Sequence, residues 1–481
     1  MNRAAVLQRG LGVGASCVVF LGVLLLVAAG RLPLGLLALL AVGLLAAAAT
    51  FAVRRPVLAP AAAAALLVAG DVAVPLVEHL AKLTSVLAAV LVLFARMAGR
   101  GRRIGWSPLL ATLALLITCA FLSTATSLDP ARSLFQDADY LVGLALAASV
   151  VAATVDRTDL LLLATVITLS GAVLCVSALT SAADLEARNN ATVVSNRPIG
   201  VFAQPNELGL AAAMTLCFSI AITVLAFRQR RRTTGALCAA TAALALVALL
   251  LSLSRGAWIG ATLGLVVLAA LLREARRPLL TGLAALVTVA VVQLVVLRTT
   301  ANVVTQRLLT LFNGQRNPYD VRPEVWAEAL DQLGRRPLLG SGPRAFPAAA
   351  RANLANFTAA RDADHAHNLL LTVGAEQGVL GAAGLIAAVS VGAWEALRNA
   401  RPPKRGPTDG SSPGPATDLV VRGVSAGAAA ALAAVIGQGI VDYPLRNPIT
   451  DALTWLVIGL LAACARTRSG RPAPEIPRFA P

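Results

Sequence analysis

The sequence predicts an all-α polytopic membrane protein with about 12–14 transmembrane helices and one large outward-facing loop that contains short helices. Of its 481 residues, 57% are hydrophobic and 14% are charged, whereas soluble domains hold roughly 45–50% apolar and about 25% charged residues. This excess excludes a soluble enzyme, and it excludes disorder because disordered chains are poor in apolar residues. The apolar runs continue for 15–22 residues. They cross ~30 Å as helix and lack the roughly ten-residue alternation of a membrane barrel.

Fourteen apolar runs are candidate membrane spans, in the order 11–29, 33–53, 56–70, 83–96, 107–124, 138–155, 159–180, 207–227, 234–252, 257–273, 278–297, 369–396, 422–440 and 450–465. The first follows a short basic segment that resembles a signal peptide, and we expect it to be retained as a helix. The third and fourth runs are short and also fit a single broken hairpin, so twelve spans remain an alternative.

The basic residues alternate between the two sides of these spans. Segments assigned to the cytoplasm hold 25 of the 41 Lys and Arg residues, short loops on the opposite side hold seven, and the long loop 298–368 holds nine. Short loops rich in Lys and Arg remain cytoplasmic, so we expect both termini in the cytoplasm and the long loop outside. Topology therefore accounts for most of the net charge of +17, and we exclude nucleic-acid binding.

The spans and loops divide the chain into five regions. These are N-terminal transmembrane helices (1–106), core transmembrane helices with outer arginine loops (107–297), the large outer loop (298–368), C-terminal transmembrane helices (369–465) and a cytoplasmic tail (466–481). The six cysteines are scattered singly through apolar runs with no CxxC pair. This pattern predicts buried packing residues rather than disulfides or metal ligands.

Arg255 stands in a short outer turn between two apolar runs, in the sequence Ser252–Leu–Ser–Arg–Gly–Ala–Trp258. An ionised residue in such a turn is a candidate functional group whose partner is an anion or a carboxylate. Arginine suits a diphosphate because its planar fork forms paired hydrogen bonds and keeps its proton. The alternative is a side chain that only snorkels to the interface. Arg197, in the outer loop 196–207, is a second-rank anion contact.

The long outer loop contains a short helix that begins near Arg322. Pro323 suits a first helical position, and Trp326, Leu330 and Leu333 recur at i, i+4 and i+7. The spacing predicts an amphipathic helix with Arg322 at its start. A surface helix with solvated charges is the alternative.

The sequence His365–Ala366–His367–Asn368 lies directly before an apolar run. At ~100° per residue, a helix that starts here places Gly374, Gly378 and Gly381 near the face of His367. A histidine above a glycine stripe suits a groove for a lipid tail. Packing of small residues between helices explains the glycines equally well.

Two Asp-x-Asp triplets, Asp137–Ala–Asp139 and Asp362–Ala–Asp364, face outward. Carboxylate pairs can hold Mg²⁺ or Mn²⁺. Helix capping or solvated charge is the more economical interpretation of a bare triplet, so we predict no metal site.

Taken in order, these motifs resemble those of the O-antigen ligase and polymerase superfamily of bacterial envelope enzymes. The matching segments are Arg197-x-x-Gly-x-Phe with Pro205–Asn206, Ser254–Arg–Gly–Ala–Trp258, Arg322-x-x-x-Trp326 with Pro337–Leu–Leu–Gly–Ser–Gly342, and His367–Asn368 followed nine residues later by Gly378-x-x-Gly381. The resemblance covers residues 110–460.

The resemblance implies a glycosyltransferase on the periplasmic face of the bacterial cytoplasmic membrane. Its donor is a glycan on undecaprenyl diphosphate and its acceptor is a sugar hydroxyl of lipid A–core or a second lipid-linked glycan. Carried over by motif, Arg255 and Arg322 hold the diphosphate and His367 lies near the reacting centre. The remaining expected substrate contacts are Arg197, Asn206, Trp258, Trp326, His365, Asn368, Gly378 and Gly381. The resemblance implies neither a cofactor nor a metal.

The alternatives share the same membrane setting. A polymerase joins two lipid-linked repeats, a protein O-oligosaccharyltransferase uses a protein hydroxyl, and a flippase moves the lipid-linked sugar without forming a bond. The final motif favours the ligase, and the concentration of unusual residues on one side disfavours the flippase. His367 acts either as a general base or by stabilising charge, since a nearby diphosphate favours its protonated form.

Overall fold

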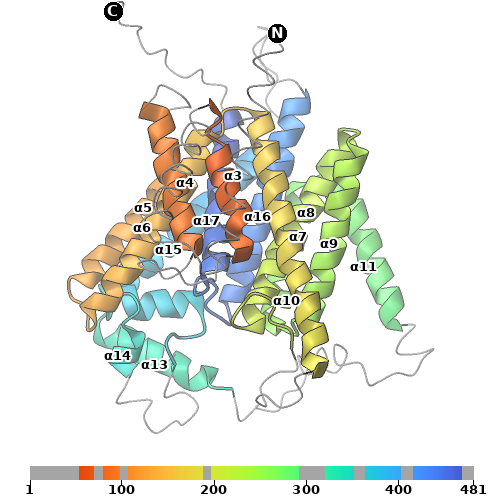
Figure 1. Cartoon of the computed structure of the whole chain (residues 1–481). Coiled ribbons are helices and arrows are strands. Elements are labelled where there is room, and N and C mark those ends of the chain that lie inside the picture. Colours follow the sequence, from red (N-terminus) through yellow and green to blue (C-terminus); the bar gives the residue numbers. More distant parts are fainter. Residues whose placement is uncertain are drawn as a thin grey trace, which may run out of the picture.

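The computed structural model describes residues 54–69, 80–97, 107–187, 197–291, 320–350, 363–401 and 415–468 (Figure 1). Every element in these ranges is helical, as predicted. The elements are α3 (Leu58–Ala65), η1 (Leu66–Ala69), α4 (Leu80–Met97), α5 (Pro108–Thr124), α6 (Pro130–Ala153), α7 (Arg157–Ala187), α8 (Pro205–Arg228), α9 (Arg232–Leu251), α10 (Arg255–Leu271), η2 (Arg273–Ala275), α11 (Arg276–Val291), α13 (Arg322–Arg335), α14 (Phe346–Ala350), α15 (Leu369–Ala400), α16 (Pro415–Gly439) and α17 (Pro448–Arg468).

Eight helices in the described ranges are long and apolar enough to cross a membrane, or nine when α10 and α11 count as one bent span. The expected spans 11–29 and 33–53 lie outside these ranges. The third expected span is a short helix, and α5 is also shorter than a full span. We predicted two separate spans at 257–273 and 278–297, and the structure instead joins α10 to α11 through a bend of 119°.

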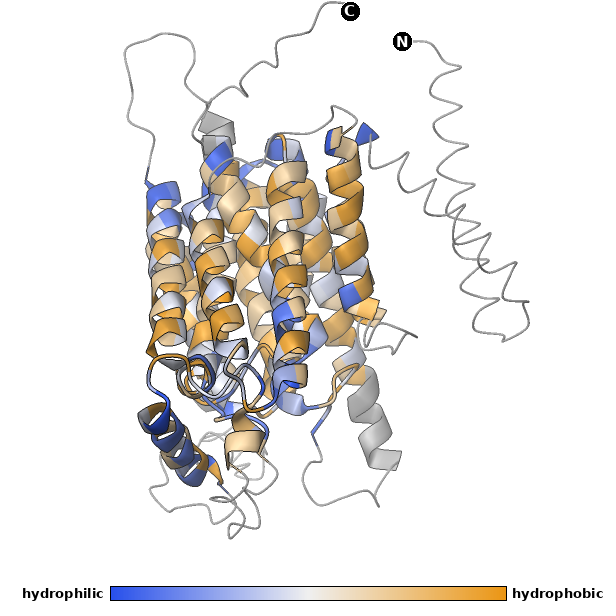
Figure 2. Cartoon of the chain, turned by 90° about the vertical axis from the view of Figure 1, so that its left-hand side faces the viewer, coloured by the Kyte–Doolittle hydropathy of each residue, from blue (hydrophilic) through white to orange (hydrophobic). Residues whose placement is uncertain are grey.

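The burial of the long helices follows their position in the bundle. Helices α8 and α17 are buried over 83% of their apolar windows, whereas α4 and α9 are buried over 33%. The exposed residues of the outer helices are apolar, and Figure 2 shows orange along the helices and blue mainly at the ends of the bundle. Apolar surface of this extent faces lipid in a membrane protein.

Helices α10 and α16 approach each other closely through small residues. A Cβ atom at Gly260 would lie 2.4 Å from the carbonyl oxygen of Ala434, and one at Gly264 would lie 2.6 Å from that of Ala430. Small residues spaced four apart allow such contact between membrane helices. This contact fixes the start of α10 beside the loop that joins α16 to α17.

Helix α15 is interrupted at Gly378, where the backbone adopts φ 66° and ψ −166°. This combination is essentially restricted to glycine. The loop 337–342 fills the interruption, because the amide of Val379 donates to Pro337 O at 2.8 Å and the amide of Gly342 donates to Glu376 O at 2.8 Å. Backbone groups freed by a break inside a membrane need such partners. The break therefore anchors the loop that follows α13.

We expect Gly378→Ala to destabilise the protein. The backbone conformation disfavours any side chain by about 1–3 kcal/mol, and a Cβ atom would lie 2.3 Å from the carbonyl carbon and oxygen of Leu338. The thermal midpoint of the purified protein should fall clearly. Gly282→Ala in α11 is the matched control, because a Cβ atom there meets nothing within 4 Å. Equal midpoints for the two variants would contradict this account of the break.

The long outer loop holds the predicted short helix. Helix α13 has Arg322 as its first residue and Pro323 in its first turn, and it lies with α14 at one end of the bundle (Figure 1). The predicted apolar face was wrong, since Leu330 is exposed. The buried face contains Glu328 and Gln332, because the Gln332 amide donates both to the Glu328 carboxylate at 2.9 Å and to the carbonyl of Phe346 at 3.2 Å.

Candidate active site

The starts of several helices meet around residues 440–442, in the loop between α16 and α17. The Arg322 guanidinium at the start of α13 donates through Nε to Val441 O at 2.9 Å. The Asn368 amide before α15 donates to Ile440 O at 2.8 Å. At the start of α10, a Cβ atom on Gly256 would lie 2.9 Å from the side chain of Val441. Helix N-termini favour anions, so this end of the bundle suits a negatively charged ligand.

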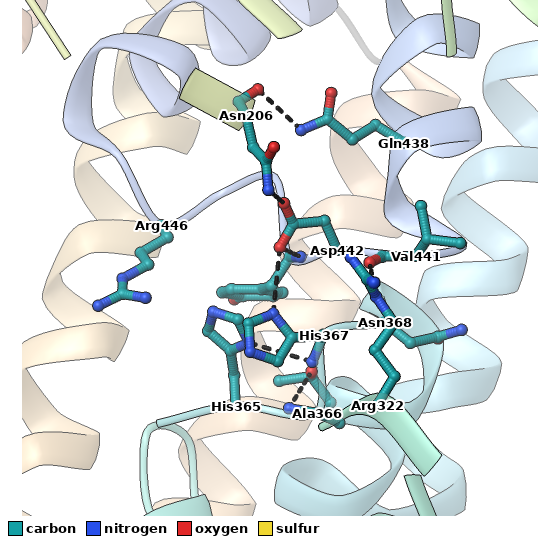
Figure 3. A network of polar contacts seen from close by, with 12 residues as sticks. Asn206, Arg322, His365, Ala366, His367, Asn368, Gln438, Val441, Asp442 and Arg446 are labelled. Carbon is teal, nitrogen blue, oxygen red and sulfur yellow. Dashed lines mark hydrogen bonds and ion pairs between the residues drawn. The ribbon is translucent and has the colours of Figure 1, made fainter. Parts of the chain in front are cut away.

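Asp442 lies at the centre of a polar network (Figure 3). Its Oδ2 accepts a hydrogen bond from Asn206 Nδ2 at 3.0 Å, and its Oδ1 accepts the Tyr443 amide at 2.9 Å and lies 3.4 Å from His367 Nδ1. Burial acts to raise the pKa of Asp442, but the hydrogen bonds from His367 and Tyr443 outweigh it, and the pKa lies below its usual value. A half-buried carboxylate is therefore held ionised against an imidazole.

His367 presents its ring from a backbone with φ 47°, in the left-handed region that non-glycine residues seldom adopt. Its amide donates to His365 Nδ1 at 3.1 Å, and its side chain is 29% exposed. The ring's Nδ1 faces Asp442, while Nε2 has no hydrogen-bond partner among the described residues. An imidazole oriented by a carboxylate through one nitrogen can accept a proton at the other.

His365 lies beside His367 and is buried. The two ring centroids are 4.3 Å apart, and the His365 ring is 5.4 Å from that of Tyr443. Burial lowers the pKa of His365 to about 4, so the ring is neutral near pH 7. Its Nε2 lies 3.5 Å from Asp364, which also pairs with Arg446 at 2.8 Å.

Arg255 and Arg322 differ in how their guanidinium groups are engaged. Arg322 pairs with Asp320 at 3.3 Å and is 28% exposed. The half-buried guanidinium of Arg255 forms no hydrogen bond or ion pair with any residue that the structure describes. Because α13 and the start of α10 both contact Val441, the structure brings the two predicted arginines to the same loop.

Arg197 and Asn206 connect this loop to the neighbouring turns. Arg197 donates to Ser252 O at 2.8 Å and to Asn206 Oδ1 at 3.2 Å. The backbone carbonyl of Asn206 accepts the Gln438 amide at 3.1 Å. These contacts position Asp442 and the turn before Arg255. Arg197 and Asn206 therefore lie next to the polar network around Asp442.

Asn368 is both a loop contact and a helix cap. Its Oδ1 accepts the amide of Leu371 at 2.9 Å and so caps the start of α15. A capping side chain that also bonds Ile440 O fixes the direction in which α15 leaves His367.

Three predicted substrate contacts have structural roles elsewhere, and Trp326 is half-buried on α13 with no hydrogen-bond partner for its indole nitrogen among the described residues. The Trp258 indole donates to Leu249 O at 3.0 Å, which links α10 to α9. Gly378 forms the break in α15, and a Cβ atom at Gly381 would lie 2.3 Å from Gln377 Cβ. The expected glycine face is wrong in geometry, since a non-helical residue at Gly378 ends the regular 100° progression.

The aspartate triplets do not form paired carboxylate sites in the described residues. Asp137 is buried and accepts the Thr124 hydroxyl at 2.7 Å, while Asp139 pairs with Lys82 at 2.8 Å. Asp362 lies outside the described residues, and Asp364 pairs with Arg446. Each described carboxylate of the triplets thus has a partner of its own, and Asp137 is buried rather than solvated.

Asp442 is the residue that the sequence analysis missed. It occupies an outer turn between two apolar runs, in Gly439–Ile–Val–Asp–Tyr–Pro444. Like Arg255, Asp442 is an ionised residue in a short turn between two apolar runs, and such a residue is a candidate functional group. What the sequence does not show is that Asp442 lies against a histidine 75 residues earlier in the chain.

The fold and this site define a polytopic membrane protein in which loops at one end of the helix bundle bring Arg322 to a histidine–aspartate pair. Residues 240–386 match the family model Wzy_C, described as O-antigen ligase, which is the superfamily that the motifs of this chain resemble. A comparison with curated proteins gave no match. The matched segment contains Arg255, Arg322 and His367, whereas Asn206 and Asp442 lie outside it.

Proposed function

We propose that the protein transfers a glycan from undecaprenyl diphosphate to a sugar hydroxyl of lipid A–core at the periplasmic face of the bacterial cytoplasmic membrane. The observation that carries this proposal is that Arg322 and the His367–Asp442 pair lie at the loop 440–442, and that Gly256, next to Arg255, packs against the same loop. An anion site and a proton acceptor are the two elements that transfer from a lipid diphosphate requires.

An apolar cavity next to this loop supports a lipid-linked donor. The cavity measures about 470 Å³, and its lining runs from Leu369 and Tyr443, beside the polar network, to Leu397 near the end of α15. Beyond the break at Gly378 the lining follows α15 from Leu385 to Leu397, which at ~1.5 Å per residue is about 18 Å. A long apolar wall that begins at a polar site suits a polyprenyl tail whose diphosphate lies at the arginines.

In the proposed reaction, His367 Nε2 accepts the proton of the acceptor hydroxyl while that oxygen bonds the anomeric carbon of the donor sugar. The bond from this carbon to the phosphate oxygen breaks, and undecaprenyl diphosphate leaves with an additional negative charge. Arg255 and Arg322 stabilise that charge. Asp442 stabilises the imidazolium that forms on His367, which favours the base role for this residue.

The structure offers little support for a flippase. The break in α15 is closed by backbone hydrogen bonds from the loop 337–342. The buried carboxylate of Glu376 accepts the backbone amides of Arg344 and Phe346, and that of Glu395 accepts the amide of Leu109 at 3.4 Å. These groups hold segments together, whereas a transport pathway needs groups that face an open channel.

The proposed activity is tested by reconstituting the purified protein with a lipid-diphosphate glycan and competing acceptors. The acceptors are lipid A–core, a second lipid-linked repeat and a pilin-like peptide. We expect the glycan on lipid A–core. Transfer to the second repeat would replace the ligase with a polymerase, and transfer to the peptide would replace it with a protein O-oligosaccharyltransferase. Movement of the lipid-linked sugar across vesicles without a new bond would indicate a flippase.

We also expect transfer to persist in EDTA. Carboxylates of the kind that hold Mg²⁺ are engaged by cations here, Asp139 by Lys82 and Asp364 by Arg446. The arginines supply the positive charge that stabilises the leaving diphosphate. Rates measured before and after chelation should agree or rise. Loss of transfer that Mg²⁺ or Mn²⁺ restores would contradict the proposed role of the arginines.

A further inference from the structure

The imidazoles of His365 and His367 and the Asp442 carboxylate form a compact set of potential metal ligands. One ligand atom from each lies within 4.8 Å of the other two. His367 Nδ1 and Asp442 Oδ1 are 3.4 Å apart. In a tetrahedral zinc site with ligands at 2.0–2.2 Å, neighbouring ligand atoms are about 3.3–3.5 Å apart. Two of the three ligands therefore already have the required separation, and His365 completes the set by a small movement of its side chain.

Neighbouring residues hydrogen-bond or pair with these ligands and so fix their orientation, as the partners of metal ligands do in zinc sites. Asp364 lies 3.5 Å from His365 Nε2, which favours a proton on that nitrogen and leaves the lone pair on Nδ1. Asp442 keeps a hydrogen bond from Asn206 on Oδ2, so Oδ1 is the oxygen that faces the histidines. His365 Nδ1 now accepts a hydrogen bond from the His367 amide. A metal bound to Nδ1 would replace that hydrogen bond.

An ion can reach this cluster from outside. The His367 side chain is 29% exposed, whereas that of His365 is 6% exposed. The open side of His367 leaves a fourth position for water. Two neutral imidazoles and one carboxylate are a set that zinc accepts, while Mg²⁺ and Ca²⁺ prefer oxygen ligands.

We propose that His365, His367 and Asp442 bind a zinc ion, and that this ion inhibits the enzyme. The ion displaces the proton shared by His367 Nδ1 and Asp442 Oδ1, and that proton is released to solvent. With a cation on Nδ1 and the carboxylate engaged, His367 no longer accepts a proton effectively at Nε2. The inhibition rests on the proposed function, but the zinc site itself does not.

The site is tested by direct binding to the whole purified protein without substrate. After chelation, zinc is titrated by calorimetry and by competition with a chromogenic chelator. We expect one zinc ion per chain, and we expect His365→Gln and Asp442→Asn each to weaken binding at least tenfold. His79→Gln, which removes the remaining histidine of the chain, is the matched control and should bind as the wild type does.

Thermal midpoints provide a second measurement that does not depend on the folded yield of any variant. Zinc should raise the midpoint of the wild type and of His79→Gln, and it should leave that of His365→Gln unchanged. Absence of zinc binding to the wild type, or equal loss in His79→Gln, would overturn the site.

Inhibition is measured separately, as transfer with zinc and then with EDTA. We expect zinc to abolish most transfer and EDTA to restore it. Zinc binding at the site without inhibition would overturn the regulatory half of the proposal. A protein that binds zinc but transfers no glycan under any condition would instead contradict the proposed function and leave the zinc site standing.

Discussion

Arg255→Ala and Arg322→Ala are each expected to lower the rate of glycan transfer by about 10²–10³-fold, as the loss of one preorganised donor to a developing charge does in other enzymes. Arg255 has no partner among the described residues, so its guanidinium is available to a ligand. Arg322 is held on Val441 O and is therefore oriented in advance. The measurement is transfer by purified, reconstituted variants.

Arg335→Ala is the control for this loss. Arg335 ends the helix that Arg322 begins, and its exposed guanidinium pairs with Asp331 at 2.8 Å and with the buried carboxylate of Glu328 at 3.0 Å. We expect this variant to keep nearly full activity. Arg322→Lys should recover only part of the lost activity, because lysine lacks the planar fork. Wild-type rates for Arg255→Ala or Arg322→Ala would remove the proposed anion site.

The second large effect is expected at the His367–Asp442 pair. His367→Ala should lower the rate by about 10²–10⁴-fold, the usual contribution of a general base. Asp442→Asn should lower it by a similar factor, because an asparagine amide can donate to Nδ1 and so leave the proton on Nε2, the nitrogen that must accept one. We expect kcat to fall while KM for the donor changes little.

Asp331→Asn removes a carboxylate of comparable charge from the surface of α13 and provides the matched control. It should transfer at the wild-type rate. A histidine that only binds the diphosphate of the donor, without a base role, predicts a different pattern, in which Asp442→Asn raises KM for the donor and leaves kcat nearly unchanged. That pattern would refute the proposed proton transfer.

The parts of the structure that follow from local chemistry were predictable from the sequence. Apolar runs of membrane length gave the helical class, Pro323 placed the start of α13 at Arg322, and the isolated charge at Arg255 pointed to the outer turn. Each of these depends on a few neighbouring residues.

The parts that depend on tertiary contacts were not predictable in the same way. The prediction of a glycine face on α15 was wrong because Gly378 has a non-helical backbone. That conformation accompanies the hydrogen bonds between α15 and the loop 337–342, which the sequence does not show. The buried face of α13 differs from its apolar stripe because the Gln332 amide donates to both Glu328 and Phe346 O. Asp442 gains its importance only when the fold places it against His367.

The most direct measurement is an experimental structure of the protein with undecaprenyl diphosphate bound. We predict phosphate oxygens at about 3 Å from the guanidinium groups of Arg255 and Arg322, a distance typical of charge-assisted hydrogen bonds, and the polyprenyl tail in the cavity beside Leu369. A diphosphate bound away from both arginines, or a tail that lies outside this cavity, would contradict the account.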